Sequence, residues 1–147
     1  MTNKTKTLIV EDNLDVLSNF EIAYRLDVLG EPKPIRLSED PVRKLEELGI
    51  DVTQTYREAE EFVGLRSYGF VLLDHNLPRD SDQDTQGIGY SLIPKIRQMN
   101  PRAIIIGTSS ERDARGKDGL DYELDKSDYN FGEGLKEIYE TEGGKTK

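Results

Sequence analysis

Three short apolar runs, each ending abruptly on polar residues, constrain the fold of this chain most strongly. They are Thr7–Val10 (TLIV), Tyr68–Leu73 (YGFVLL) and Ala103–Gly107 (AIIIG). Apolar and β-branched residues follow one another in these runs instead of alternating with polar ones. This pattern is typical of strands that are buried on both faces of a parallel sheet. Two weaker strands are predicted at Ile50–Tyr56 and Leu120–Leu124.

Segments with helical spacing separate these strands. The predicted helices span Asp15–Leu29, a short stretch beginning at Asp40 and Pro41, Glu58–Leu65, Gly89–Met99 and Asp128–Glu140, with at most one turn at Glu111–Arg115. The acidic stretch Pro78–Gly87 is predicted to be a loop. Strands that alternate with helices are typical of a parallel sheet covered on both sides. We therefore predict an α/β fold, a doubly wound five-stranded parallel sheet with helices on both faces.

A single domain is expected, with one region that is harder to place. The 147 residues suit one compact domain. An insertion around residues 30–49 separates the first helix from the strand at Ile50, and Pro34–Leu37 (PIRL) is an alternative second strand. The tail, residues 141–147, is expected to be frayed.

Composition argues against several classes of protein. Hydrophobic residues make up 35% of the chain and charged residues 33%, and the net charge is −9. Nucleic acid and anionic membranes bind surfaces rich in Lys and Arg, so neither is expected as a partner. The chain has no cysteine, which excludes disulfides and thiolate metal sites. It also shows no apolar run of about 20 residues and no signal-peptide pattern, so we expect a cytoplasmic protein.

Acidic, hydroxyl and lysine side chains stand where the predicted strands end. Glu11 and Asp12 follow the first strand, Asp74 the third, Thr108 and Ser109 the fourth, and Asp125 and Lys126 the fifth. The carboxyl ends of parallel strands meet at one edge of the sheet, where such folds bind ligands. Carboxylates gathered there would repel one another without a cation. Mg²⁺ prefers oxygen ligands, and a lysine and a hydroxyl beside it suit a phosphoryl group.

Together these segments resemble the receiver domain of bacterial two-component response regulators, the CheY-like fold. The matching stretches are IVEDN after the first strand, LLDHNLP around Asp74, IIIGTSSE at the fourth strand and GLDYELDK ending at Lys126. The resemblance covers roughly Thr7 to Tyr139, with the stretches in the right order and at the right strand ends. It implies a flavodoxin-like sheet and a stand-alone receiver of a phosphorelay, which would signal by binding a downstream protein target.

The resemblance implies how the acidic residues would act. Asp74 would accept a phosphoryl group from phosphohistidine on a sensor histidine kinase or a histidine phosphotransfer protein. Mg²⁺ would be held by Glu11, Asp12, Asp74 and the backbone carbonyl of Asn76. Such a transfer proceeds by in-line displacement, in which positioning and neutralisation of charge lower the barrier.

Further residues around the phosphoryl group are implied by the same resemblance. Lys126 and one hydroxyl would contact the phosphoryl oxygens. We favour Ser109 as that hydroxyl, and Thr108 is the alternative. Asn76 and Glu111 would tune how fast water removes the phosphoryl group.

The chain departs from the family pattern where such domains pass on their signal. The position three residues before the lysine usually carries an aromatic side chain, and here it is Glu123. The usual proline after the lysine is Ser127, and the segment from Ser109 to Lys126 is short. An alternative function is therefore a pseudo-receiver, an interaction module that works without phosphorylation. A phosphohydrolase is disfavoured, because Asn76 stands where such enzymes usually carry a second acid.

Two other features have ordinary interpretations. His75, the single histidine, is expected to be packed or exposed and not to be a ligand. Asp80, Asp82 and Asp84 have the spacing that opens a calcium loop, but Thr85 stands where such loops require glycine. We therefore expect a solvated acidic loop.

Overall fold

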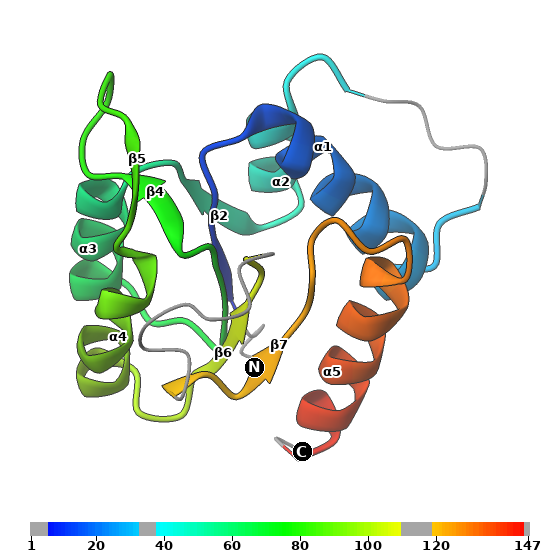
Figure 1. Ribbon diagram of the computed structural model, residues 1–147. Coiled ribbons are helices and arrows are strands. Elements are labelled where there is room, and N and C mark those ends of the chain that lie inside the picture. Colours follow the sequence, from blue (N-terminus) through cyan, green and yellow to red (C-terminus); the bar gives the residue numbers. More distant parts are fainter. Residues whose placement is uncertain (1–5, 33–37, 110–118, 146–147) are drawn as a thin grey trace.

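Five parallel strands form the central sheet in the order β2-β1-β3-β6-β7 (Figure 1). Their bounds are β1 Thr7–Val10, β2 Ile50–Thr53, β3 Phe70–Leu73, β6 Ile104–Gly107 and β7 Tyr122–Glu123. The computed structural model describes residues 6–32, 38–109 and 119–145. The chain passes from β1 to β2 on one side and then to β3 on the other, so the strand order reverses at β1. In doubly wound sheets, ligands bind at such a reversal.

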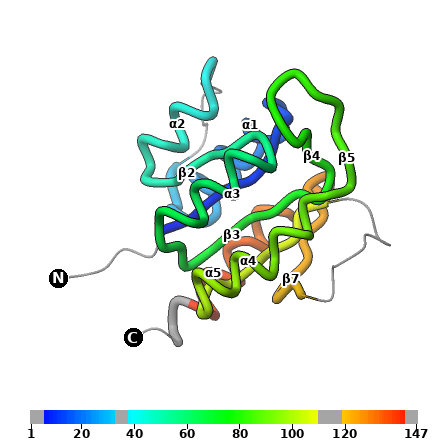
Figure 2. Tube along the Cα trace, turned by 90° about the vertical axis from the view of Figure 1, so that its left-hand side faces the viewer, coloured from blue at the N-terminus to red at the C-terminus, as the bar shows by residue number. Residues whose placement is uncertain are grey.

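Helices cover both faces of this sheet, as Figures 1 and 2 show. The helices of one face are α3 (Tyr56–Leu65) and α4 (Ile93–Met99). Those of the other face are α1 (Leu14–Ala23), α2 (Pro41–Glu47) and α5 (Phe131–Lys145). The predicted fold class, a doubly wound five-stranded parallel sheet, is therefore confirmed.

The apolar runs of the strands supply two cores, because successive strand residues point to opposite faces. The core beneath α3 and α4 includes Leu8, Val10, Val71, Leu73 and Ile105 of the strands, with Ala59, Val63 and Ile96 of the helices. The core beneath α1 and α5 includes Ile9, Leu72 and Ile106, with Leu17, Phe20, Phe131 and Leu135. Continuous apolar runs, and not alternating ones, are therefore what this sheet requires.

The first predicted helix, Asp15–Leu29, changes geometry part-way. α1 ends at Ala23, and a π-helical segment, η1, continues over Tyr24–Val28. Gly30, with a φ of 70°, then turns the chain out of the helix. The strand expected at Ile50 is confirmed, since β2 pairs with β1.

The insertion around residues 30–49 contains α2, which begins at the predicted place. Pro41 occupies its first turn, and the carboxylate of Asp40 accepts a hydrogen bond from the Arg43 N–H at 3.1 Å. The alternative strand at Pro34–Leu37 lies outside the described residues, as does the turn expected at Glu111–Arg115.

The strand predicted at Ile50–Tyr56 is too long, because Tyr56 already begins α3. The Thr55 hydroxyl accepts a hydrogen bond from the Glu58 N–H at 3.1 Å, and the Glu58 carboxylate accepts one from the Gln54 N–H at 3.0 Å. Such reciprocal capping satisfies N–H groups that have no partner within the helix. These capping hydrogen bonds favour a helix start at Tyr56, although the β-branched residues before it favour a strand.

The prediction of a loop over Pro78–Gly87 is confirmed for residues 79–84 and wrong at its two ends. The chain there forms an antiparallel hairpin of β4 (Asn76–Pro78) and β5 (Thr85–Gly87). Arg57 of α3 holds the hairpin, because its guanidinium lies 3.1 Å from the carboxylate of Asp80 and its N–H donates to the carbonyl of Arg79 at 3.1 Å. All of β5 is exposed, so no apolar alternation marks it in the sequence.

Three further boundaries differ from the predictions. The strand expected at Leu120–Leu124 is reduced to β7. The helix expected at Gly89–Met99 opens with a 3₁₀ turn, η2 (Gly89–Leu92), before α4 begins. The last helix starts at Phe131 and runs to Lys145, so the expectation of a frayed tail is wrong for residues 141–145. No helix in the described part of the chain is long and apolar enough to cross a membrane.

Candidate functional site

The carboxyl ends of β1 and β3 bring Glu11 and Asp74 side by side. Val10 pairs with Leu73, so the residues that follow them lie at the same level. The backbone ladder continues past the strands, since the Asp74 N–H donates to the Val10 carbonyl at 3.1 Å and the Glu11 N–H donates to the Thr53 carbonyl at 3.0 Å. Glu11 is 0% and Asp74 1% exposed. Two carboxylates so deeply buried require a compensating cation.

Lys126 provides one positive charge between these two carboxylates. Its Nζ donates to Oε1 of Glu11 at 2.8 Å and to Oδ2 of Asp74 at 2.9 Å. The Lys126 N–H also donates to the carbonyl of Thr108 at 3.4 Å, which ties the residue to the end of β6. The structure thus brings together residues from the ends of three strands, as the sequence predicted for Glu11, Asp74 and Lys126.

Asp12 completes an all-oxygen donor set. One carboxylate oxygen each from Glu11, Asp12 and Asp74 lies within 4.8 Å of the others. Asp12 is only half-buried, so this side of the cluster opens to solvent. One lysine charge does not balance three carboxylates. A hard divalent cation that keeps some of its waters, such as Mg²⁺, fits the chemistry and the half-open position of these donors.

The electrostatics of the cluster show the same imbalance. Burial, together with the nearby charge of Asp74, raises the pKa of Glu11 to about 7, although the hydrogen bond from Lys126 opposes the shift. Burial acts to lower the pKa of Lys126, but its hydrogen bonds to Glu11 and Asp74 prevail and raise that pKa above its usual value. Lys126 therefore stays charged, while Glu11 readily takes up a proton in the absence of a metal.

Solved structures share this architecture. A CheY-like receiver domain from Methylobacillus flagellatus has a TM-score of 0.59 and 21% identity, covering 93% of this chain and 97% of its own. One from Methanospirillum hungatei JF-1 has a TM-score of 0.61 and 16% identity, covering 93% and 92%. The response regulator TrrA from Thermotoga maritima, in complex with Mg²⁺-BeF, has a TM-score of 0.57 and 20% identity, covering 93% and 98%.

This chain has the CheY-like fold. A scan against protein-family models gave no match, and neither did a search of curated proteins. At these low identities the likeness concerns the fold, so the role of each residue rests on the geometry of the site.

Two residues with hydroxyl side chains, Thr108 and Ser109, follow the end of β6. Leu73 pairs with Gly107, so Thr108 follows at the level of Asp74, and the Thr108 N–H donates to the Leu73 carbonyl at 3.0 Å. The Thr108 hydroxyl is fully buried and has no hydrogen-bond partner among the described residues. Ser109 is half-buried. A buried hydroxyl without a partner costs about 1–3 kcal/mol, which makes Thr108 a candidate hydrogen-bond donor to a ligand at this strand end.

Asn76 lies where β3 leads into the hairpin. Its N–H donates to Oδ1 of Asp74 at 3.4 Å, and the residue pairs with Gly87 across the hairpin. Glu111 lies outside the described residues. Asp125, another strand-end acid, turns to its own loop, because its carboxylate accepts hydrogen bonds from the N–H and the hydroxyl of Ser127 at 2.9 and 2.5 Å.

The region where receivers usually carry an aromatic residue is also rearranged. Glu123 is exposed, whereas Tyr122 packs into the core beneath α5 and its hydroxyl donates to Glu142 at 2.5 Å. This hydrogen bond raises the pKa of Tyr122. No aromatic side chain therefore occupies position 123, as the sequence indicates.

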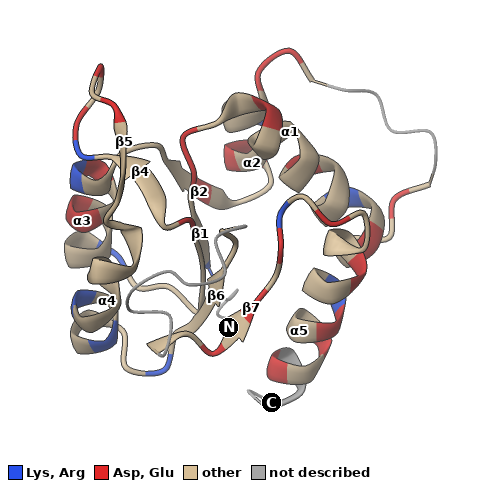
Figure 3. Ribbon diagram, in the orientation of Figure 1, with Lys and Arg blue, Asp and Glu red and all other residues tan. Residues whose placement is uncertain are grey.

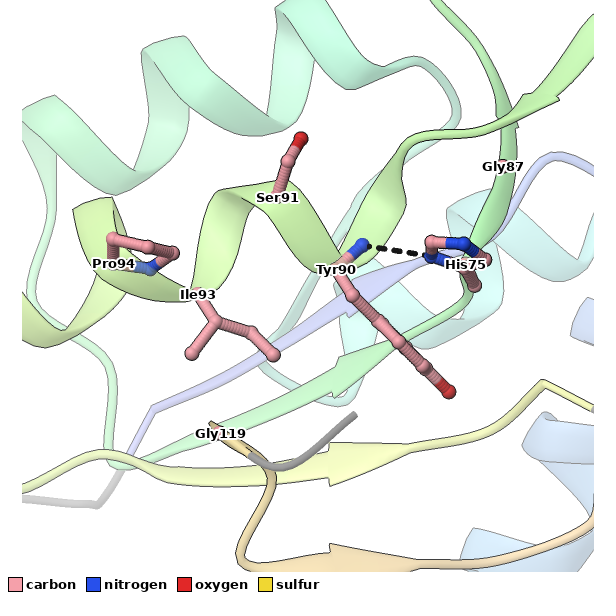
Figure 4. Close-up of a pocket in the computed structure, with 7 residues that line it drawn as sticks. All are labelled: His75, Gly87, Tyr90, Ser91, Ile93, Pro94 and Gly119. Atoms are coloured by element: carbon pink, nitrogen blue, oxygen red, sulfur yellow. Dashed lines mark hydrogen bonds between the residues drawn. The ribbon is translucent and has the colours of Figure 1, made fainter. Parts of the chain in front are cut away.

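The sequence analysis did not identify Gly89 as close to the site, and it left open whether His75 is packed or exposed. Gly89 packs so closely on the backbone that a Cβ there would lie 1.9 Å from the carbonyl oxygen of Asp74. Its place after the acidic stretch is the only signal that the sequence offers. His75 is packed, as expected, and its ring lies against the ring of Tyr90 (Figure 4).

Proposed function

We propose that Asp74 accepts a phosphoryl group from a phosphohistidine of a partner protein, so that the chain works as a receiver of a two-component phosphorelay. The observation that carries this proposal is the bridge from Lys126 to both Asp74 and Glu11, beside the carboxylate of Asp12. The proposal is supported by a carboxylate, a fixed cation and an all-oxygen donor set that lie together at the strand-order reversal of a CheY-like fold.

In the transfer step, a carboxylate oxygen of Asp74 attacks the phosphorus of the phosphohistidine. The new oxygen–phosphorus bond forms as the phosphorus–nitrogen bond breaks, and the electron pair of that bond stays on the imidazole. The ammonium of Lys126 remains beside Asp74 and neutralises charge on the phosphoryl oxygens. Hydrolysis later restores the free carboxylate of Asp74: water attacks the phosphorus, the bond to Asp74 breaks, and inorganic phosphate leaves.

Glu11, Asp12, Asp74 and the backbone carbonyl of Asn76 would hold Mg²⁺. When bound, this ion supplies positive charge to the phosphoryl oxygens. The protein's own contribution is to hold the Asp74 carboxylate in place, through Lys126 on one oxygen and the Asn76 N–H on the other.

The hydroxyl that donates a hydrogen bond to a phosphoryl oxygen is either that of Ser109 or that of Thr108. The strand register and the unpartnered, buried hydroxyl support Thr108. Ser109, favoured by the sequence pattern, stays a prediction. Alanine variants of the two residues, compared by their affinity for beryllofluoride, distinguish these alternatives. The variant that lacks the contacting hydroxyl will bind beryllofluoride about tenfold more weakly, as expected for the loss of a hydrogen bond to a charged group.

The phosphodonor would be a sensor histidine kinase or a histidine phosphotransfer protein, and the output would be binding to a downstream protein. Figure 3 shows Asp and Glu along α5 and in the loops, whereas α4 carries only Lys and Arg among its charged residues. A donor with a basic or apolar docking face would complement the acidic side of the molecule.

Intact-protein mass spectrometry after incubation with acetyl phosphate tests the proposal. We expect wild type to gain one phosphoryl group in a Mg²⁺-dependent manner, and Asp74→Asn to gain none. Asp84→Asn, at an exposed aspartate of the hairpin, is the matched control and will react like wild type. A wild type that neither gains the group nor binds beryllofluoride with Mg²⁺ would overturn the proposal in favour of a phosphorylation-independent pseudo-receiver.

A further inference from the structure

His75 stands between two residues of the proposed site and is not used by the chemistry above. It directly follows Asp74 and precedes Asn76, and only 5% of it is exposed. Its Nδ1 accepts a hydrogen bond from the backbone N–H of Tyr90 at 3.1 Å (Figure 4). The rings of His75 and Tyr90 also pack together, with centroids 4.5 Å apart and an interplanar angle of 39°.

This hydrogen bond fixes the chemical form of the imidazole. A nitrogen that accepts from an N–H carries a lone pair, so the ring proton of neutral His75 resides on Nε2. Gly87 makes room for that nitrogen, since a Cβ at Gly87 would lie 3.1 Å from Nε2. The ring is therefore held on one edge by Tyr90 and enclosed on the other by the hairpin.

The backbone of His75 is held by the same segment. Its carbonyl accepts hydrogen bonds from the N–H groups of Ile88 at 3.1 Å and Gly89 at 2.7 Å. Together with the ring, residues 88–90 thus contact His75 through three hydrogen bonds. Rotation of the chain at His75 would disturb Asp74 on one side and the Asn76 carbonyl on the other.

We infer that His75 is a positioning residue, which orients the Asp74 carboxylate and the Asn76 carbonyl for Mg²⁺ by accepting the Tyr90 N–H. The inference rests on the proposed function. Groups that orient metal ligands without touching the metal typically contribute about 10–100-fold to metal affinity. His75 differs from such residues because it acts through the backbone, so we expect its contribution to Mg²⁺ affinity to be about tenfold, the lower end of this range.

The test uses two substitutions that differ in a single property. His75→Asn retains an acceptor, because its side-chain oxygen reaches the place of Nδ1, whereas His75→Leu fills similar space without one. We expect His75→Leu to weaken Mg²⁺ binding, measured by titration calorimetry, by about tenfold, and His75→Asn to stay within about twofold of wild type. Amide exchange of Tyr90, measured by NMR without metal, should speed up in His75→Leu only.

Val63→Ala is the control for general loosening, since Val63 is a buried core residue of α3. It should lower the melting temperature without changing Mg²⁺ affinity. Equal Mg²⁺ binding by wild type and His75→Leu would overturn the inference and leave the proposed function intact, as would equal losses in His75→Leu and His75→Asn. A wild type that does not bind Mg²⁺ would overturn the proposed function and this inference with it.

Discussion

Glu11 is an acid held in a place where its charge is costly. Burial and the neighbouring Asp74 raise its pKa from 4.5 to about 7 in the folded protein. An acid whose pKa is higher in the folded than in the unfolded chain stabilises the fold while it is protonated. That contribution is complete below pH 4.5 and is lost as the pH rises through about 7.

The metal-free protein should therefore lose stability relative to Glu11→Gln between pH 5 and pH 8, by roughly 2–3 kcal/mol. Urea unfolding in the presence of a chelator at a series of pH values measures this difference. Glu47→Gln serves as a control, because Glu47 is exposed and its substitution should leave the pH profile unchanged. Parallel profiles for wild type and Glu11→Gln would show that Glu11 does not titrate as described.

Lys126 neutralises the two buried carboxylates, so its removal should be costly. Lys126→Met leaves the buried carboxylates of Glu11 and Asp74 without a neighbouring positive charge, and we expect a loss of roughly 3 kcal/mol in the free energy of unfolding at pH 8 without metal. Lys136→Met, which breaks an exposed pair with Glu140, should change stability by less than about 1 kcal/mol. Similar values for the two variants in denaturant titrations would contradict a structural role for the bridge.

At the scale of the elements, the contact between η2 and the end of β3 leaves no room for a side chain. Gly89→Ala would place a Cβ 1.9 Å from the Asp74 carbonyl oxygen, which is backbone and cannot move aside cheaply. We expect a loss of about 2–3 kcal/mol. Gly64→Ala is the matched substitution within α3, with nothing within 4 Å of its Cβ, and should gain up to about 1 kcal/mol. Thermal unfolding of both proteins measures the contrast; a Gly89→Ala protein as stable as wild type would contradict the close packing.

The elements that the sequence predicted well are those whose burial is complete. TLIV and FVLL are continuous apolar runs, and they become β1 and β3 at the centre of the sheet. β5 could not be found in this way, because Thr85–Gly87 is exposed and pairs only with β4 in the sheet. α5 was predicted too short, since Gly143 and Gly144 weaken its helical pattern, although the helix continues to Lys145.

Across the whole molecule, Mg²⁺ should stabilise the fold in proportion to its occupancy. A ligand that binds only the folded state at a concentration of 100 times its Kd adds about 2.7 kcal/mol. We expect Mg²⁺ to raise the melting temperature of wild type at pH 8 and not that of Asp12→Asn, which removes one carboxylate of the cluster. Asp84→Asn should respond like wild type. A uniform response of all three proteins would point to a general salt effect.

The site as a whole was more predictable than its details. Glu11, Asp74 and Lys126 were found because parallel strands present their carboxyl ends together, a property that depends only on element order. The choice between Thr108 and Ser109 depends on strand register, which the apolar run IIIG does not mark in the sequence. The hydrogen bond between His75 and Tyr90 spans the whole hairpin, so no local pattern could show it.

The bridge of Lys126 to Glu11 joins positions 115 residues apart. A nascent chain leaving the ribosome exposes both acids long before their lysine has been synthesised. Until β7 is in place, Glu11 and Asp74 repel one another at the centre of the forming sheet. The buried charges of the site are therefore neutralised only once the last strand has been made.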